Sequence, residues 1–185
     1  RRLLSEAGYC QGKFLTIPLT FRSNVPADKL LALTWQAQVQ RDLPDCLVLN
    51  LDGVESTTIY RQLDKGAYKS VILDWSGQYP DPEAYLTPLL SCIASEGDIC
   101  LDGEAAISGS FWSTPGLEKS LQASDALRGP ARLAPLQRVE ELTATGAAYI
   151  PVWLEAPRAW GQTDLSTPEF DGSGRVLLHQ LRRDS

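Results

Sequence analysis

The chain has 185 residues, of which 43% are hydrophobic and 22% charged, and its formal net charge is −6. This length fits one domain with its own core, or one lobe of a larger protein. The acidic balance argues against nucleic acid and anionic membrane surfaces as partners, because there is no surplus of Lys and Arg to neutralise phosphates. The most apolar stretch, residues 147–154, is far shorter than the roughly 20 residues of a membrane-spanning helix.

The first half of the chain alternates predicted strands and helices. Residues 14–22 alternate apolar and polar side chains, which is typical of a strand, and residues 25–43 repeat apolar side chains every four positions, which indicates a helix. Residues 46–51 predict a strand that is covered on both faces. A second helix is predicted over residues 56–65 and a third strand over residues 68–75. This order predicts a parallel sheet with right-handed crossovers.

The second half is richer in predicted helices. The predicted elements are, in order, a short helix that begins at Asp81-Pro82-Glu83, a loop over residues 92–112, helices over residues 115–127 and 129–146, a strand over residues 147–154, and a candidate partner strand over residues 158–162. The sequence therefore predicts an α/β fold whose sheet is mostly parallel and carries helices on both faces.

Four cysteines occur without a Cys-x-x-Cys pair, and the only histidine is His179. These numbers exclude the usual zinc spacings, so no metal and no cofactor is predicted. An even number of cysteines favours disulfides and an oxidising compartment. Cys92 and Cys100 enclose a short polar segment with little else to order it, and we predict that they form a disulfide. Cys46 opens an apolar run and can equally be a buried thiol, so its state and that of Cys10 stay open.

A candidate binding surface follows the third predicted strand. Ligands of open α/β sheets bind outside the carboxyl ends of the strands, where Trp75, Ser76, Gly77 and Gln78 follow one strand and Asn24 follows another. Trp75 offers a flat apolar face with one donor, Ser76 and Gln78 offer polar contacts, and Gly77 lets a ligand approach the backbone. Spacing alone leaves an equal alternative, in which Trp75 belongs to the core and the others form a plain turn.

Catalytic arrangements are poorly supported. A Cys–His pair would need His179, which lies in a charged tail, and a carboxylate pair would come from Asp52, Asp74, Asp81 and Glu83. The last two already have a role in the first turn of a helix. The sequence contains no nucleophile-elbow, dinucleotide-binding or phosphate-binding loop pattern. No catalytic residue is predicted.

The stretch GAYKSVILDWSGQYPDPEAYLTPLLS, residues 66–91, resembles extracellular solute-binding proteins of family 5, the oligopeptide- and dipeptide-binding receptors of bacterial ABC importers. In that family, a strand with the pattern Gly-x-Tyr/Phe-Asp ends in a Trp-containing turn that precedes a Tyr-x-Asp-Pro helix start. Four further segments resemble the family in the same order: RRLLSEAGY, LTIPLTFRSN, FWSTPGLEKSLQAS and AAYIPVWLEAPRAW.

The resemblance implies one lobe of a type II periplasmic-binding-protein fold. Residues 1–185 would form the second, C-terminal lobe of a larger two-lobe receptor, and residues 1–12 the remnant of a preceding helix and linker. The absence of methionine also predicts that the chain is a piece of a longer protein. Such a receptor is not an enzyme. It is periplasmic or extracellular, in some cases lipid-anchored at its N-terminus, and it delivers its solute to the membrane permease of the importer.

The resemblance also places the solute, a peptide or peptide-like molecule, against Trp75, Ser76, Gly77 and Gln78. Peptide binders of the family usually carry Asp at the position of Gln78, where it pairs with the α-amine of the peptide. Acceptance of a free peptide N-terminus therefore stays open. A free-standing hydrolase with a carboxylate pair and a plain interaction domain remain alternatives, and exposure of the Trp75 indole in a groove would favour the receptor over both.

Overall fold

The structure is a computed structural model, and it describes residues 1–183. The chain divides into two compact units. The first unit comprises Arg1–Asp74 and Ala106–Phe111, and the second comprises Trp75–Ala105 and the described residues from Trp112 onward. The prediction that residues 1–185 form a single lobe stays a prediction. Among the described residues, no helix has both the length and the apolar character needed to cross a membrane.

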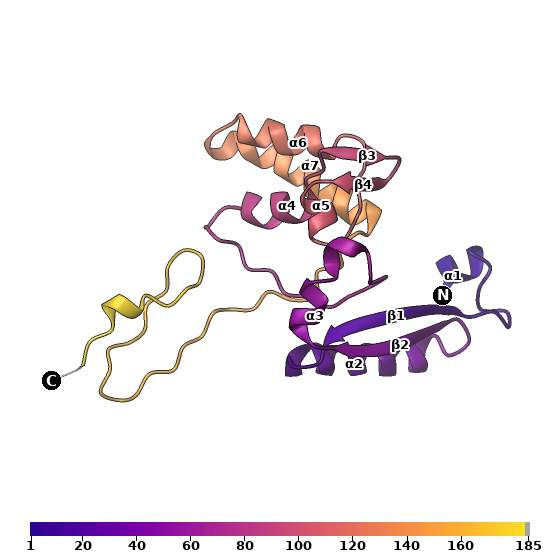
Figure 1. The fold of residues 1–185 in the computed structure, drawn as a ribbon, viewed down its shortest axis with the longest axis horizontal. Coiled ribbons are helices and arrows are strands. Elements are labelled where there is room, and N and C mark those ends of the chain that lie inside the picture. The colour runs from indigo at the N-terminus through magenta and orange to yellow at the C-terminus, as the bar shows by residue number, and fades with distance from the viewer. Residues whose placement is uncertain (184–185) are drawn as a thin grey trace. The chain divides into compact units, whose positions relative to one another are not determined.

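The first unit is built on a parallel pair of strands. β1 (Leu15–Arg22) and β2 (Leu47–Val54) run side by side, and α2 (Pro26–Asp42) connects them and packs against them (Figure 1). As predicted, α2 begins with Pro26, which loses no hydrogen bond there, and carries Asp28 in its first turn. Side chains from α2, both strands and the following segment form one buried cluster: Leu19, Phe21, Leu31, Ala32, Leu49 and Ile72.

The third strand, predicted over residues 68–75, is reduced to a single parallel bridge between Val71 and Thr20. The Thr20 N–H donates to the Ser70 carbonyl at 3.0 Å, and the Thr20 carbonyl accepts from the Ile72 N–H at 2.9 Å. Two residues earlier, β1 would present its next donor on this side, but that residue is Pro18 and has no N–H. The order and direction of the segment are as predicted, whereas its length as a strand is wrong.

The segment that follows β2 contains a short helix and a single 3-10 turn. α3 (Ser56–Tyr60) and η1 (Leu63–Lys65) replace the single helix predicted over residues 56–65. Ile59 and Leu63 are buried as expected, and Gly66 ends η1 with a positive φ of 63°. Before β1, a disulfide joins Cys10, which follows α1 (Arg2–Glu6), to Cys46. The sequence left the state of this pair open.

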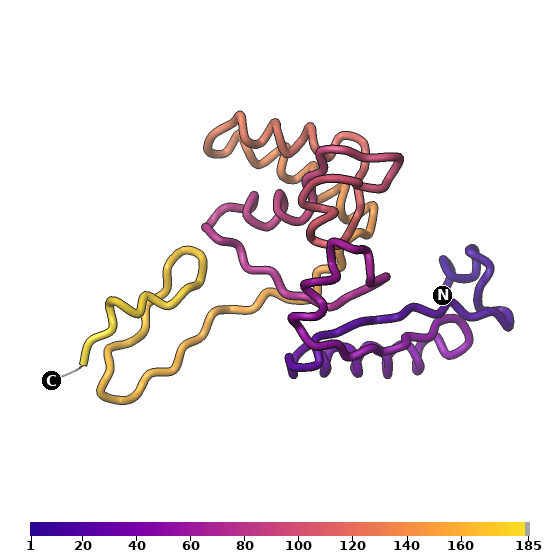
Figure 2. Tube along the Cα trace, in the orientation of Figure 1, coloured from indigo at the N-terminus to yellow at the C-terminus, as the bar shows by residue number. Residues whose placement is uncertain are grey.

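The second unit contains the helices that were predicted in the second half of the chain. They are α4 (Glu83–Leu90), α6 (Leu117–Asp125) and α7 (Leu133–Gly146), the last preceded by η2 (Gly129–Arg132). Their buried sides meet in a second cluster: Leu90, Leu117, Leu121 and Val139. α6 and α7 lie side by side (Figure 2). Pro88 does not end the first of these helices but lies inside it.

A hairpin replaces part of the loop predicted over residues 92–112. β3 (Ala94–Glu96) pairs antiparallel with β4 (Ile99–Asp102), and α5 (Glu104–Ile107) follows. A disulfide joins Cys92 to Cys100, the pair that the sequence predicts. Both cysteines are buried together with Ala105.

The strand predicted over residues 147–154 and its partner over residues 158–162 are both wrong. Within residues 147–183 the only regular element of the described chain is η3 (Leu178–Gln180), and the only bridges are Leu165–Arg183 and Phe170–Val176. Apolar content suggested a buried strand, yet the Leu154 side chain is 95% exposed. The described chain offers this stretch no neighbouring strand, and Pro151 lacks an N–H with which to pair.

Candidate functional site

The Trp75 side chain is held by a hydrogen bond at its indole nitrogen, and the residue is partly exposed. Its indole Nε1 donates a hydrogen bond of 2.9 Å to the carbonyl oxygen of Ala84 in α4, while 43% of the residue remains exposed. In a regular helix this carbonyl would accept the N–H of the residue four positions later, which is Pro88 and has none. The proline inside α4 therefore supplies the acceptor that orients the tryptophan.

The residues that follow Trp75 form an exposed turn over a buried glycine. Ser76 and Gln78 are exposed, and Gly77 is buried. A Cβ atom at Gly77 would lie 2.6 Å from Cε2 of Tyr85, so the ring of Tyr85 lies directly over the glycine. This contact requires the absence of a side chain at Gly77. The polar groups of Ser76 and Gln78 face solvent.

Hydrogen bonds hold the turn to the start of α4. The Tyr79 hydroxyl donates to the Glu83 carboxylate at 2.5 Å, and this bond raises the pKa of Tyr79 to about 12. The Asp81 carboxylate accepts the backbone N–H of Glu83 at 2.9 Å and also pairs with Arg132. The Glu83 N–H, followed by Arg132, lowers the pKa of Asp81 despite partial burial. Asp81 therefore stays ionised just before the start of α4.

Asn24 lies in the first unit, directly after β1. Its side-chain oxygen accepts hydrogen bonds from the backbone N–H of Ser56 at 3.1 Å and from the Ser56 hydroxyl at 2.6 Å. Asn24 thereby links the end of β1 to the start of α3. Since Trp75 and Gln78 lie in the other unit, a joint site with Asn24 stays a prediction.

The carboxyl edge of the first unit carries a charged network that the sequence analysis missed. Arg22, the last residue of β1, is only 6% exposed. Its Nε and Nη2 donate to the two carboxylate oxygens of Asp28 at 2.7 and 3.1 Å. Its Nη1 donates to the Tyr60 hydroxyl at 3.2 Å and to Asp74 at 2.5 Å. Carboxyl ends of parallel strands are where α/β folds bind their ligands.

The network is unevenly exposed. Asp28 is buried beside Arg22, but the side chain of Asp74 is 76% exposed. The hydrogen bonding that the Asp28 carboxylate accepts outweighs the effect of burial and raises the pKa of Arg22 well above its ordinary value. A sequence signal for this network existed, since an arginine at the end of a buried strand needs carboxylate partners, and Asp28 lies in the first turn of the next helix.

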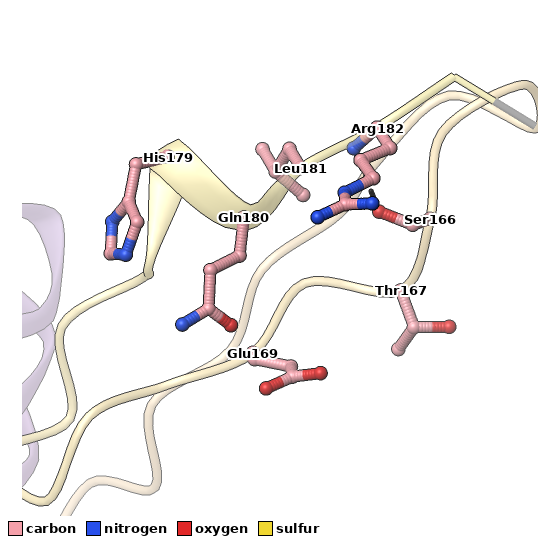
Figure 3. Close-up of a pocket in the computed structure, with 7 residues that line it drawn as sticks. All are labelled: Ser166, Thr167, Glu169, His179, Gln180, Leu181 and Arg182. Atoms are coloured by element: carbon pink, nitrogen blue, oxygen red, sulfur yellow. Dashed lines mark hydrogen bonds between the residues drawn. The ribbon is translucent and has the colours of Figure 1, made fainter.

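A separate open hollow lies in the C-terminal segment and contains none of the residues predicted from the sequence (Figure 3). Its lining residues are Ser166, Thr167, Glu169, His179, Gln180, Leu181 and Arg182. The backbone N–H of Arg182 donates to the Ser166 hydroxyl at 3.0 Å, while the His179 ring lies apart from both hydroxyls (Figure 3). This arrangement does not pair a nucleophile with a base.

Metal ligands are not gathered in the part of the chain that the structure describes. Residues 1–183 contain no group of three or more His, Cys, Asp or Glu side chains placed to hold an ion.

The similarity of this chain to known proteins lies in its fold. No protein-family model matches the sequence, and no curated protein matches it. A dipeptide-binding protein from Pseudoalteromonas sp. SM9913, solved in complex with Met-Leu, aligns with 99% of this chain at a TM-score of 0.74 and 19% identity. The aligned part makes up 34% of that protein.

Two other solved structures show the same relationship. NikA from Brucella suis, solved in complex with Fe(III)-EDTA, aligns with 99% of this chain at a TM-score of 0.69 and 18% identity, over 37% of its own length. The murein tripeptide binding protein MppA of Escherichia coli aligns with 80% of this chain at a TM-score of 0.64 and 22% identity, over 26% of its length. The chain therefore has the α/β fold of periplasmic binding proteins, as predicted, and spans well under half of each of them.

Proposed function

We propose that this chain is the second lobe of a family 5 solute-binding protein, which binds a peptide or peptide-like solute in a cleft between two lobes. The observation that carries the proposal is the fold match to a dipeptide-binding protein over 99% of this chain, at a TM-score of 0.74. That match takes up 34% of the other protein, in keeping with one lobe of a larger receptor. MppA, another match, is named for a murein tripeptide, which supports the peptide class.

The proposed ligand-facing residues are Trp75, Ser76, Gly77 and Gln78, together with Asn24. Trp75 suits this role because a fixed hydrogen bond orients its ring and leaves 43% of the residue exposed. A rigid, half-exposed aromatic face buries apolar area of a ligand at little cost in conformational entropy. Ser76 and Gln78 would supply the few polar contacts that orient the solute.

The receptor is proposed to have no catalytic activity, in keeping with its structural neighbours, which are named as binding proteins. A hydrolase would need one carboxyl group to be protonated near neutral pH, and Asp81 does not suit that role because its pKa is lowered. A plain interaction domain would need the Trp75 turn to be buried in the core of the chain. Trp75 instead lies outside the buried clusters of the described residues.

The proposed location is the periplasm or the cell exterior, with lipid anchoring through a preceding segment. The two disulfides, Cys10–Cys46 and Cys92–Cys100, support an oxidising compartment. The proposed partner is the membrane permease of an ABC importer, to which the closed receptor delivers its solute.

Mass spectrometry of the complete protein, purified without refolding, tests the proposed function. We expect a peptide or peptide-like molecule to be released on denaturation and to bind again in calorimetry. The 185-residue chain alone should bind it weakly, because one lobe leaves most of the ligand in water, against the 70–90% that is typically buried in a closed site. Binding by the chain alone that equals binding by the complete protein would contradict the two-lobe proposal.

A further inference from the structure

Asp74 exposes its carboxylate to solvent while it is hydrogen-bonded to the buried side chain of Arg22. One of its oxygens accepts a hydrogen bond from Nη1 of Arg22 at 2.5 Å, yet its side chain is 76% exposed. The arginine that holds it has a side chain only 7% exposed. A surface aspartate normally samples several rotamers, whereas this one is oriented by a guanidinium that is itself fixed on a second side by Asp28.

The negative charge of Asp74 is not needed to compensate the positive charge of Arg22. Asp28 already pairs with Arg22 through two hydrogen bonds, so the buried positive charge is compensated before Asp74 is counted. Nη1, which donates to Asp74, also donates to the Tyr60 hydroxyl at 3.2 Å. A neutral hydrogen-bond acceptor in place of Asp74 would complete the hydrogen bonding of the Arg22 guanidinium. The three ionised groups instead sum to one negative charge, and that charge reaches solvent at Asp74.

The same hydrogen bonds determine whether this site can bind an anion or a cation. An anion would need the donors of Arg22, but Nε, Nη1 and Nη2 all donate to protein oxygens and the residue is 6% exposed. A cation needs an exposed, oriented carboxylate oxygen, which Asp74 provides. Its position also fits, because Arg22 ends β1 and Asp74 follows the segment that bridges to β1, at the carboxyl edge of the parallel strands.

We propose that Asp74 is a specificity-determining residue that binds an ammonium or guanidinium group of the solute, with Arg22 as its positioning residue. The proposal rests on the proposed function, and it narrows the solute class to peptides or peptide-like molecules with a cationic side group.

Calorimetric titration of the complete protein tests this site with two tripeptides, Ala-Lys-Ala and Ala-norleucine-Ala, which differ in one ammonium group. Asp74→Asn keeps an oxygen for Arg22 but removes the charge. Asp64→Asn removes the same charge from an exposed carboxylate on η1 and serves as the matched control. We expect Asp74→Asn to weaken binding of the lysine peptide about tenfold or more and to leave the norleucine peptide unchanged. Asp64→Asn should change neither affinity.

A second measurement separates failure of this site from failure of the proposed function. The carboxyl carbon of Asp74, observed by NMR in ¹³C-aspartate-labelled protein, should shift on titration with n-butylammonium and not with n-butanol. If the tripeptides bind but their affinities do not depend on Asp74, the cation site is wrong and the peptide receptor stands. If no peptide binds while butylammonium still shifts Asp74, the proposed receptor is wrong and the cation site stands. Loss of both responses overturns both.

Discussion

The indole N–H of Trp75 donates to the carbonyl oxygen of Ala84 at 2.9 Å, and this bond exists because Pro88 leaves that carbonyl without its helical partner. A helix-interior proline is normally a cost, since one backbone hydrogen bond is lost. Here the orphaned acceptor fixes the side chain that we place at the centre of the binding turn. Trp75 and Pro88, thirteen positions apart, are therefore linked through one hydrogen bond that orients the indole.

Replacing Pro88 with alanine should loosen Trp75. The new N–H competes for the Ala84 carbonyl, so the indole N–H loses its partner for part of the time. We expect faster hydrogen exchange of the Trp75 indole proton in ¹H–¹⁵N spectra, with the signal assigned through Trp75→Phe. The indole proton of Trp35, which packs against the cluster of the first unit, serves as the control and should not change. Unchanged protection at Trp75 would show that Pro88 has no part in orienting it.

Adding one methyl group at Gly77 should destabilise the protein. The new Cβ would lie 2.6 Å from the Tyr85 ring, so the ring must move away, at a cost of about 1–3 kcal/mol in the free energy of unfolding. The matched control is Gly161→Ala, whose Cβ would meet nothing closer than 3.8 Å, and its effect should stay within about 0.5 kcal/mol. Urea denaturation measures both.

A double variant tests whether the Tyr85 ring causes the loss of stability in Gly77→Ala. In a Tyr85→Ala background the ring is absent, and Gly77→Ala should then cost little. An equal loss in both backgrounds would mean that the glycine is required for a reason other than its contact with Tyr85.

Replacing Arg22 should lower the free energy of unfolding far more than replacing a surface arginine. Arg22→Met leaves the Asp28 carboxylate buried without its cation, and breaking a buried pair in this way costs about 3–5 kcal/mol. The double variant Arg22→Met/Asp28→Leu removes both charges and should recover most of the loss. Arg138, which pairs with Glu141 on the exposed side of α7, is the control, and its replacement by Met should cost under about 1 kcal/mol. A mild effect of Arg22→Met in urea denaturation would contradict the network.

The Tyr79–Glu83 hydrogen bond predicts a dependence of stability on alkaline pH. Because the pKa of Tyr79 is raised in the folded protein to about 12, from its ordinary value of 10.0, the bond stabilises the fold below pH 10. That contribution is lost as the pH rises towards 12. The Cζ resonance of Tyr79 should report the raised pKa, and Glu83→Gln should bring it back towards its ordinary value. A Tyr79 titration that Glu83→Gln leaves unmoved would rule out this bond in solution.

The sequence predicted α2, α6, α7 and the first two strands to within a few residues. Periodicity was sufficient for α2, α7 and β1, whereas α6 was predicted from a helix-start signal and β2 from an apolar run. The prediction that β2 is covered on both faces is wrong, since Val48, Asn50 and Asp52 are exposed. The third strand was predicted too long because a property of its neighbour limits it, namely the missing N–H of Pro18. β3 and β4 have three and four residues, too few for a period to be recognised. Residues 147–154 carried apolar side chains, but apolar content does not make a strand without a partner.

The candidate site was only partly accessible to sequence reasoning. The Trp75 turn could be proposed from the sequence because its residues are consecutive. The network of Arg22 could be anticipated only in part. Asp28 lies 6 positions away in the first turn of the next helix, but Asp74 lies 52 positions away and only the fold brings it to Arg22. The burial that makes the network informative depends on tertiary structure, whereas the sequence shows only that an arginine ends an apolar strand.

The measurement that tests the central claim most directly is the titration of the complete protein and its Gln78→Asp variant with a peptide and its N-acetylated form. A carboxylate facing the free amine makes a charge-assisted hydrogen bond, so the variant should gain about tenfold or more for the free peptide. It should gain nothing for the acetylated one, because a new charge would be buried without a partner. An unchanged ratio of the two affinities would mean that Gln78 does not face the ligand and that the binding site lies elsewhere.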